Sequence, residues 1–384
     1  MKFSHLGDCH LGSWRQPELK ELNFKSFQIA IDTSIKEKVE FVLISGDLFD
    51  SAYPSIETLK ETFEEFKKLK EARIPVFLIA GSHDYSVSGK TFLDVLAKAG
   101  FCQNATRFEE KDGKICLIPI IYKNFAIYGY PGKKSGLEVE EIKRIKLEDT
   151  PGLFKILMLH TAIRDAAPNP MINAIDETKL PETDYLALSH LHINYNKNRR
   201  VYSGPTFPNS LLELEELQAG TFYIFDHGEI RRQEIKLKDV YSLNLEIKDA
   251  LTATERILDF LKTENLKDKI VILKLFGILE KGKTSDIDFN KIESYVIKSG
   301  AYSFLKSTTK LKISMPEIKL DFLDSENLES QVISKFKENN PNKFNELIDS
   351  LIRSLQTEKM DDEKSVIFEE RIISDAKKIL KNEV

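Results

Sequence analysis

The sequence of 384 residues has few cysteines and no excess of positive charge. Its three cysteines, Cys9, Cys102 and Cys116, are too few and too irregularly spaced for a disulfide framework or a zinc cluster, and they suit a reducing compartment. No apolar run approaches the roughly 20 residues that a membrane span needs. The first residues enter a strand-like run without the basic segment and cleavage site of a signal peptide. We therefore expect a soluble, cytoplasmic protein, associated with the nucleoid in a prokaryote, with no membrane partner.

The formal net charge of −5 lacks the basicity that is typical of a nucleic-acid-binding protein. Any contact with DNA must therefore come from local clusters of lysine and arginine or from bound metal ions. The hydrophobic fraction of 41% allows sizeable cores, and the length suits about two or three domains.

Short apolar runs alternate with helical patterns over residues 1–236, which predicts a layered α/β domain. Strands are expected at Lys2–Leu6, Glu40–Ser45, Pro75–Ala80, Cys116–Ile121, Asn124–Gly129, Phe154–Leu159, Tyr185–Leu188, Arg200–Ser203 and Gly220–Phe225. Helices are expected at Pro17–Lys38, Ile56–Lys70, Thr91–Ala99 and Leu137–Ile145. The later strands follow one another closely, so the expected sheet is mixed rather than all-parallel.

A different pattern begins at residue 239. Strands and helices over 239–313, with helices at Ala250–Lys262 and Phe289–Ser299, predict a small α+β domain. Residues 314–327 contain Pro316 and scattered acids, and they indicate a linker. Residues 328–384 are expected to be helical. One face of this tail is apolar, with residues at helical spacing: Phe344, Leu347, Ile348, Leu351, Ile352 and Leu355.

Five polar motifs carry most of the histidines, and most of them directly follow an apolar strand. They are Gly7-Asp8-Cys9-His10, Gly46-Asp47-Leu48-Phe49-Asp50, Gly81-Ser82-His83-Asp84, His160 and Ser189-His190-Leu191-His192. Ligands of open α/β sheets bind beyond the carboxyl ends of the strands. The sequence thus predicts that several carboxylates and five imidazoles meet at one place.

Mixed oxygen and nitrogen ligands without thiolates suit Mn²⁺, Fe²⁺ or Zn²⁺ rather than Ca²⁺. Two ions roughly 3.5–4 Å apart could clamp the attacking and leaving oxygens of a displacement at phosphorus. Taken singly, each motif could be a surface pair, a turn or a structural histidine pair, but five in this order favour a metal centre. Two histidines lack such a context. We expect His5 to be a core strand residue and His227 a turn residue.

In this order the motifs resemble those of the calcineurin-like metallophosphoesterase superfamily: D-x-H, G-D-x-x-D, G-N-H-D/E, H and G-H-x-H. The resemblance covers roughly residues 1–235. Within the superfamily, Asp8–Gly12, Gly46–Phe49 and Val201–Thr206 look like the Mre/SbcD nucleases of double-strand-break repair. The resemblance implies a β-sandwich flanked by helices on both faces (αββα), followed by a capping domain and a helical tail.

The resemblance also implies residue roles and two Mn²⁺ ions per chain, with Mg²⁺, Fe²⁺ or Zn²⁺ as alternatives. Asp8, His10, Asp47 and His192 would hold the first ion. Asp47, Ser82, His160 and His190 would hold the second, so that Asp47 bridges the two. His83 would be a catalytic histidine that protonates the leaving oxygen or steadies the phosphate. Asp50 would orient the imidazole of His83.

The chain departs from the family pattern at three positions. Ser82 stands where the family has an asparagine ligand, and a hydroxyl is a shorter and weaker ligand arm. Ser189 replaces a glycine before the paired histidines. Asp50 stands where many Mre nucleases have histidine, although the wider superfamily uses this aspartate beside the catalytic imidazole.

DNA ends, an ATPase and a second copy of the chain are the expected partners. Lys197, Arg199 and Arg200 follow the last ligands and could hold phosphates, unless they form a solvated hairpin tip. Lys133 and Lys134 are weaker candidates. By the resemblance, the second domain caps the site, and the tail docks on the coiled-coil base of a Rad/SbcC ATPase unless it packs on its own domain. Dimer contacts are expected on the second and third helices, from Phe63, Phe66, Leu69, Phe92, Leu93 and Leu96.

Three functions remain open on the sequence alone. The first is a Mn²⁺-dependent DNA nuclease, a double-strand exonuclease and single-strand endonuclease that acts in break repair with the ATPase. The second uses the same chemistry as a phosphodiesterase or phosphatase of a small nucleotide or a protein. The third is a weakly catalytic scaffold that binds DNA ends, for which the motivation is Ser82.

Overall fold

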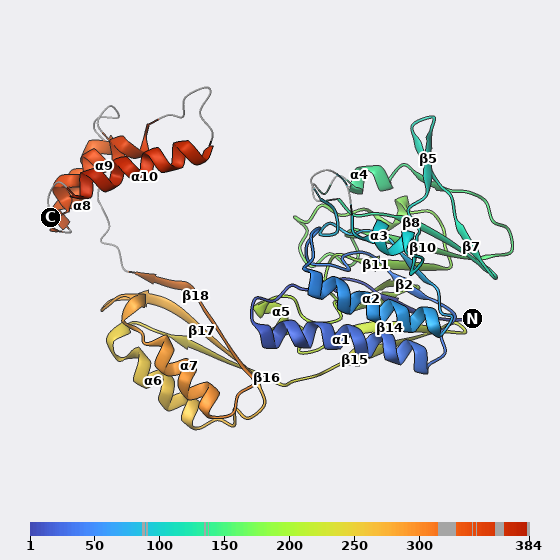
Figure 1. Cartoon of the computed structure of the whole chain (residues 1–384), viewed down its shortest axis with the longest axis horizontal. Coiled ribbons are helices and arrows are strands. Elements are labelled where there is room, and N and C mark those ends of the chain that lie inside the picture. The colour runs from blue at the N-terminus through green and yellow to red at the C-terminus, as the bar shows by residue number, and fades with distance from the viewer. Residues whose placement is uncertain are drawn as a thin grey trace. The chain divides into compact units, whose positions relative to one another are not determined.

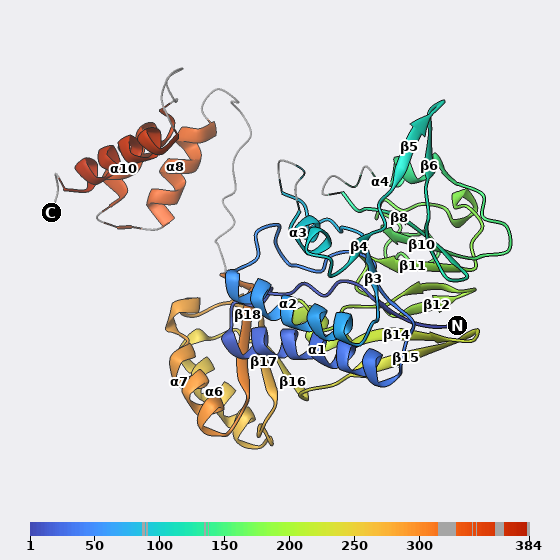
Figure 2. The ribbon, with the colours of Figure 1, turned by 45° about the vertical axis from the view of Figure 1, so that its right-hand side comes forward.

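The computed structural model describes residues 1–86, 89, 91–133, 136, 138–313, 328–339, 341–342, 344–357 and 365–381. The chain divides into two compact units, Met1–Leu311 and Lys312–Val384. Residues 1–236 and 239–311 thus belong to one unit. The expected linker at residues 314–327 lies outside the described residues, as does Lys134. Figures 1 and 2 label the helices and strands.

The first sheet of the larger unit has six strands in the order β15-β14-β1-β2-β3-β4. β1 (Lys2–Leu6), β2 (Val42–Ile44), β3 (Val76–Leu78) and β4 (Gln103–Asn104) run parallel. β14 (Gly220–Asp226) and β15 (Glu229–Ile235) complete it in antiparallel pairs. The expected mixed sheet is therefore present.

Three helices cover the outer face of this sheet: α1 (Pro17–Lys36), α2 (Ile56–Glu71) and α3 (Leu93–Lys98). α1 begins with a proline, whose fixed φ suits the first helical position, and Ser55 caps α2 by accepting from the N–H of Thr58. The apolar faces of the helices enter a core with the outward-facing strand residues. Figure 2 shows α1 and α2 side by side.

The second sheet has the order β12-β13-β11-β10-β8-β7. Its strands are β7 (Ile120–Tyr122), β8 (Phe125–Tyr130), β10 (Phe154–His160), β11 (Tyr185–Ser189), β12 (Tyr195–Lys197) and β13 (Arg200–Tyr202). Aromatic rings fill the space between the two sheets. The ring of Phe3 lies 5.0 Å from that of Tyr185, and the ring of Phe41 lies 4.8 Å from that of Phe125. The two sheets thus form a sandwich around an aromatic core.

The outer face of the second sheet is covered differently from the expected helical layer. A three-stranded sheet of β5 (Phe108–Lys111), β6 (Lys114–Leu117) and β9 (Ile145–Leu147) packs there with the short helix α4 (Glu138–Ile142). The strand expected at Cys116–Ile121 is split into β6 and β7, because Pro119 has no N–H to donate and interrupts the ladder. The helix expected at Leu137–Ile145 ends early because Ile145 pairs with Ile115 in β9.

A second three-stranded sheet follows the sandwich, with β16 (Val240–Glu246), β17 (Ile270–Leu279) and β18 (Ser303–Ile313) in that order. β18 replaces the two strands expected near Tyr302 and Lys310. α6 (Ala250–Lys262) and α7 (Phe289–Lys298) pack on one face. The other face contacts α1 and the region of α5 (Leu211–Leu217) through a cluster of Leu19, Leu22, Phe207, Leu214, Ile270, Ile272 and Leu305. Two short 3₁₀ turns lie at Glu177–Lys179 and Thr284–Asp286.

The smaller unit contains α8 (Leu328–Asn339), a 3₁₀ turn at Asn345–Leu347, α9 (Ile348–Leu355) and α10 (Ser365–Lys381). α9 packs on α10. The apolar face expected from Phe344 onward is not one regular helix, since the α-helical part begins at Ile348. Leu347 is buried, whereas Phe344 and Leu355 are 44% and 64% exposed. Among the described residues of the whole chain, no helix has the length and apolarity that crossing a membrane requires.

Candidate metal centre

The five motifs meet at the edge where the carboxyl ends of the two sheets come together. β1, β2 and β3 deliver three of them, and β10 and β11 deliver the other two. Asp8, His10, Asp47, His190 and His192 have positive φ angles between 43° and 106°. Residues other than glycine rarely adopt this conformation, and such strain clusters at functional sites. The backbone therefore holds these side chains in place at an energetic cost to the fold.

Asp8, His10 and His192 form one group of possible ligands. The Nε2 atoms of the two imidazoles lie 3.0 Å apart, and Nε2 of His192 lies 3.8 Å from Oδ1 of Asp8. The same carboxylate accepts hydrogen bonds from the N–H of His190, at 3.0 and 2.9 Å. The start of the last motif is thus tied to the first.

Asp8, Asp47 and His160 form a second group. Nε2 of His160 lies 3.2 Å from Oδ2 of Asp47 and has no hydrogen-bond partner among the described residues. Oδ2 of Asp47 also lies 3.7 Å from Nε2 of His10. Asp47 therefore faces both groups. Gly46 precedes it with a φ of +111°, and a side chain at Gly46 would collide with the His160 ring.

Three imidazoles share one arrangement, with Nδ1 occupied by an acceptor and Nε2 directed into the centre. His10 donates from Nδ1 to Asp50 Oδ1 at 3.2 Å, and His192 lies 3.1 Å from Oε2 of Glu213. His160 donates to Oγ of Ser189 at 2.9 Å, and Ser189 donates onward to the carbonyl of Ser45. An acceptor at Nδ1 fixes the tautomer that leaves the Nε2 lone pair for a metal ion.

His190 and Ser82 lie at the margin of the centre. The His190 ring is 5.0 Å from the His160 ring, and burial and then the charge of His160 lower the pKa of His190 to about 4. Ser82 donates from Oγ to Oδ2 of Asp47 at 3.3 Å. The hydroxyl is thus engaged with the expected bridging carboxylate. The structure brings both residues to the second group, where the sequence places them.

His83 borders a hollow of about 430 Å³ beside the centre, which Asp50, Ser51, Ala52, Tyr53, Ser82 and Ser86 also line. Its side chain is 48% exposed. Nδ1 of His83 donates to the backbone carbonyl of Asp50 at 2.8 Å, whereas the Asp50 carboxylate is 3.9 Å away and lies closer to His10. The expected Asp50–His83 pair therefore takes a different form, in which the carbonyl orients His83 and the carboxylate orients His10.

Two carboxylates of the site have no role in the sequence predictions: Glu213, which lies outside the five motifs, and Asp84, which belongs to the third motif. Glu213, in α5, holds His192 and also accepts from the N–H of Asn209 at 2.9 Å. Asp84 is buried and accepts from the N–H groups of Phe49 and Gly81, which joins the second motif to the third. Burial, and then the charge of Asp47, raise the pKa of Asp84 to about 7. The Ser210-x-x-Glu213 spacing of a helix cap is the one sequence signal for Glu213.

The electrostatics of the centre favour a cation. Burial lowers the pKa values of His160 and His192, but the nearby carboxylates outweigh it and raise both to about 9, through Asp47 and Asp8 for His160 and through Asp8 and Glu213 for His192. The same field that retains protons on these rings would attract a divalent ion in their place. The donor set therefore fits the metal ions that the resemblance implies.

The structure does not bring the expected DNA-binding cluster to the centre. β13 runs parallel to β11, and Arg200, its first residue, pairs with Leu186 near the start of β11. Lys197, Arg199 and Arg200 thus lie towards the amino ends of the strands, away from the metal ligands. Lys197 is also ion-paired with Asp165 at 2.7 Å. Adjacency to His192 in sequence does not carry over into space, because the β12–β13 hairpin turns away from the edge.

The expected dimer contacts also need correction. Phe66, Leu69, Leu93 and Leu96 are fully buried in the core between the helices and the first sheet, and Phe63 and Phe92 are partly buried against this core. The first four serve the protein's own fold.

The two other histidines behave as expected: His5 is buried between Tyr185 and Ser45, and His227 follows β14 in a turn and is exposed.

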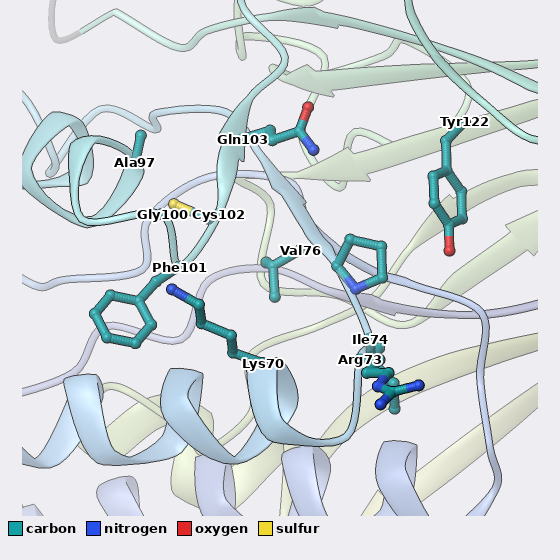
Figure 3. Close-up of a pocket in the computed structure, with 11 residues that line it drawn as sticks. Lys70, Arg73, Ile74, Val76, Ala97, Gly100, Phe101, Cys102, Gln103 and Tyr122 are labelled. Carbon is teal, nitrogen blue, oxygen red and sulfur yellow. The ribbon is translucent and has the colours of Figure 1, made fainter.

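A second hollow, of about 540 Å³, lies at the other end of β3 (Figure 3). Lys70 and Arg73 approach it from the end of α2, with the Lys70 ammonium 5.0 Å from the centre of the Phe101 ring, and Tyr122 lies apart from these two residues. None of its lining residues is a histidine or a carboxylate. This hollow is therefore separate from the metal centre.

Comparisons with known proteins agree with the geometry. A family model described as calcineurin-like phosphoesterase matches residues 1–194. The DNA double-strand break repair protein Mre11 of Methanosarcina mazei is 26% identical over 371 residues, which are 92% of this chain and 57% of that protein. The protein of the same name from Methanocaldococcus jannaschii is 27% identical over 305 residues, 76% of this chain and 77% of that protein.

A bacterial relative has a less specific name. The uncharacterized metallophosphoesterase YhaO of Bacillus subtilis is 28% identical over 207 residues, 50% of this chain and 48% of that protein. The chain spans less than three fifths of the length of its Methanosarcina relatives. The family model and the sandwich confirm the expected fold class and the expected resemblance. The chain belongs to the calcineurin-like phosphoesterase family, and within that family it resembles the Mre11 proteins.

Proposed function

We propose that this chain is a two-metal phosphodiesterase that cleaves DNA at or near ends, with Mn²⁺ as its working ion. The observation that carries the proposal is the shared arrangement of His10, His160 and His192, whose Nε2 atoms converge on the carboxylates of Asp8 and Asp47. The similarity to Mre11 proteins supports DNA as the substrate.

In this proposal Asp8, His10, Asp47 and His192 hold the first ion, and Asp47, Ser82, His160 and His190 hold the second. The position of Asp47 Oδ2, 3.7 Å from His10 and 3.2 Å from His160, supports its bridging role. Asp50, Ser189 and Glu213 fix the ligand tautomers. When bound, the ions would supply a deprotonated water as nucleophile and neutralise charge on the phosphate.

In this proposal His83 is the residue that transfers a proton to the leaving oxygen or steadies the phosphate. Its backbone N–H is fixed by Asp47 Oδ1 at 2.7 Å, and its Nδ1 is fixed by the Asp50 carbonyl. Because Nδ1 carries the proton donated to that carbonyl, Nε2 can donate to a leaving oxygen or to a phosphate oxygen in the adjoining hollow when the ring carries a second proton. Its partial exposure suits a group that must meet a substrate.

The partners and the domain roles belong to the same proposal. The sheet β16-β17-β18 with α6 and α7 acts as a capping domain, residues 239–313, on the nuclease domain of residues 1–236. The helices of residues 328–384 bind a Rad/SbcC-type ATPase, for which the exposed Phe344 and Leu355 supply apolar contact area. The protein acts as a homodimer in break repair.

Digestion of an end-labelled duplex with Mn²⁺, with Mg²⁺ and with a chelator tests the activity. We expect cleavage with Mn²⁺ and none with the chelator. Hydrolysis of bis-p-nitrophenyl phosphate or mononucleotides without any DNA cleavage would instead identify a small-molecule phosphodiesterase. Binding of DNA ends without hydrolysis of any of these substrates would indicate the scaffold function.

A further inference from the structure

The small sheet on the outside of the sandwich has one apolar and one basic face. Ile115, Leu117 and Ile145 are buried against the second sheet of the sandwich. Because side chains alternate along a strand, the residues between them point outward. Lys111 pairs with Lys114 across the β5–β6 hairpin, Cys116 pairs with Lys146, and the carbonyl of Arg144 accepts from Ile115.

Four exposed cations therefore share the outward face: Lys111, Lys114, Arg144 and Lys146. We call this set the basic face. One carboxylate, Glu109, shares it through its pairing with Cys116. Among the described residues, none of the four cations forms an ion pair with a carboxylate, and Arg144 donates only to the carbonyl of Gly113. Neighbouring Lys143, in contrast, is paired with Glu140 at 2.5 Å.

Like charges come close together on the basic face. The ammonium groups of Lys114 and Lys146 are near enough that contact with Lys146 lowers the pKa of Lys114. Such a pair is unfavourable unless an anion lies between or above it. The cations come from two short segments, residues 111–114 and 144–146, that are well separated in the sequence, so the net charge of −5 conceals a local excess of positive charge.

The basic face is connected to the metal centre through a short stretch of structure. A side chain at Gly132 would collide with the ring of His160. The next residue, Lys133, is paired with Glu141 of α4 at 2.6 Å. α4 spans about 8 Å, and Arg144 follows two residues after it. Figures 1 and 2 show α4 near the base of the β5–β6 hairpin, which extends outward.

We propose that the basic face binds the phosphate backbone of duplex DNA whose end occupies the metal centre. Unpaired cations on an exposed sheet are suited to phosphate contacts, which position a duplex without reading its sequence. The proposal rests on the proposed function, since it assigns the nuclease a contact with the duplex outside its active site. It also supplies the local cluster that an acidic chain needs for binding DNA.

The test measures binding of the full chain to a fluorescently labelled blunt duplex, with chelator present so that no cleavage occurs. Salt is varied, and the native chain is compared with Lys114→Gln/Lys146→Gln. We expect the slope of log K against log salt to fall by about 2 in the double variant, about 0.9 for each lost phosphate contact. Lys143→Gln is the matched control, because its lysine is exposed but already paired. It should keep the native slope.

Two further measurements distinguish a failure of the basic-face proposal from a failure of the proposed function. Hydrolysis of bis-p-nitrophenyl phosphate with Mn²⁺ should be equal in the native and double-variant chains, since this substrate is too small to reach the basic face. Absence of hydrolysis from the native chain would count against the proposed function alone. An unchanged salt slope in a double variant that still hydrolyses this substrate would overturn the basic face alone. Glu109→Gln should bind DNA more tightly, so a fall or no change there would also overturn it.

Discussion

Glu213 is expected to control binding of the first metal ion although it is not a ligand. Its Oε2 lies 3.1 Å from Nδ1 of His192 and is itself held by the N–H of Asn209. The carboxylate keeps the proton on Nδ1 and directs Nε2 towards Asp8. Loss of such an outer carboxylate typically raises the dissociation constant of the metal 10–100-fold, which corresponds to about 1.4–2.8 kcal/mol.

The protonation of His192 also affects metal binding, and it makes the expected effect of Glu213 depend on pH. Glu213 is one of the groups that raise the pKa of His192 to about 9 in the metal-free chain. Below that pH a proton competes with the metal ion for the His192 ring. Removal of Glu213 lowers the affinity for the metal, because the ring is no longer oriented. It also lowers the affinity of the ring for the competing proton. The two effects oppose one another near pH 7. The dissociation constant of Glu213→Ala relative to the native chain should therefore rise as the pH approaches 9.

Calorimetric Mn²⁺ titrations under argon between pH 7 and pH 9 measure this ratio. Glu213→Gln keeps an acceptor oxygen without the charge and should fall between Glu213→Ala and the native chain. Glu216→Gln, an exposed change on the same helix, is the matched control and should behave like the native chain. A Mn²⁺ dissociation constant of Glu213→Ala that stays close to that of the native chain at pH 9 would refute the argument. The orientation of His192 would then not depend on Glu213.

Further predictions concern the rest of the site and the tail. Ser82→Asn should tighten the second metal site, with 10–100-fold as a rough guide, and raise activity at limiting Mn²⁺; two equally tight ions in the native chain, unchanged by the substitution, would contradict this. His83→Asn should lower nuclease activity by about 10²–10⁴-fold with both ions retained, and a parallel loss of metal would make His83 a ligand instead. The pKa values of His160 and His192, about 9, lie above the ordinary value of about 6.5. The stability that their protonation contributes is therefore present below about pH 6.5 and lost towards pH 9. Thermal melts of the metal-free chain should show a falling Tm across that window, and Mn²⁺ binding near pH 7 should release protons, detected as a buffer-dependent heat. A chain that ends after Asp324 should remain a metal-binding nuclease but no longer co-purify with its ATPase; aggregation of that chain would assign the tail to its own core.

Sequence order predicts the metal centre well because each motif follows its strand directly. The carboxyl ends of neighbouring strands meet at one edge, so a motif's place after a strand determines its place in the fold. Asp8, Asp47 and His160 come together for this reason. The buried position of His5 is also predictable, since it lies in a short strand with the apolar residues Phe3 and Leu6.

The remaining parts depend on pairings that no local pattern encodes. Glu213 reaches His192 from a helix that belongs to none of the five motifs. Arg200 follows the ligands in sequence, yet the parallel register of β13 with β11 places it away from them. Lys114 and Lys146 are 32 positions apart and become neighbours only through the pairing of β6 with β9. Closeness in sequence therefore does not predict closeness in space where the pairing of strands, rather than the end of a strand, determines the position of a residue.

The first helix connects the metal centre to the sheet β16-β17-β18. Leu22 of α1 packs against the sheet β16-β17-β18, and the next residue, Asn23, donates to the carbonyl of Cys9 at 2.9 Å and accepts from the N–H of Gly12. The same turn of α1 therefore holds the loop between Asp8 and His10 by hydrogen bonds and packs against the sheet β16-β17-β18. If a movement of that sheet displaces this turn of α1, the loop should move with it, and by linkage an ion that fixes the loop should then favour one position of the sheet. We therefore expect metal binding to be coupled to the orientation of the sheet β16-β17-β18 through α1.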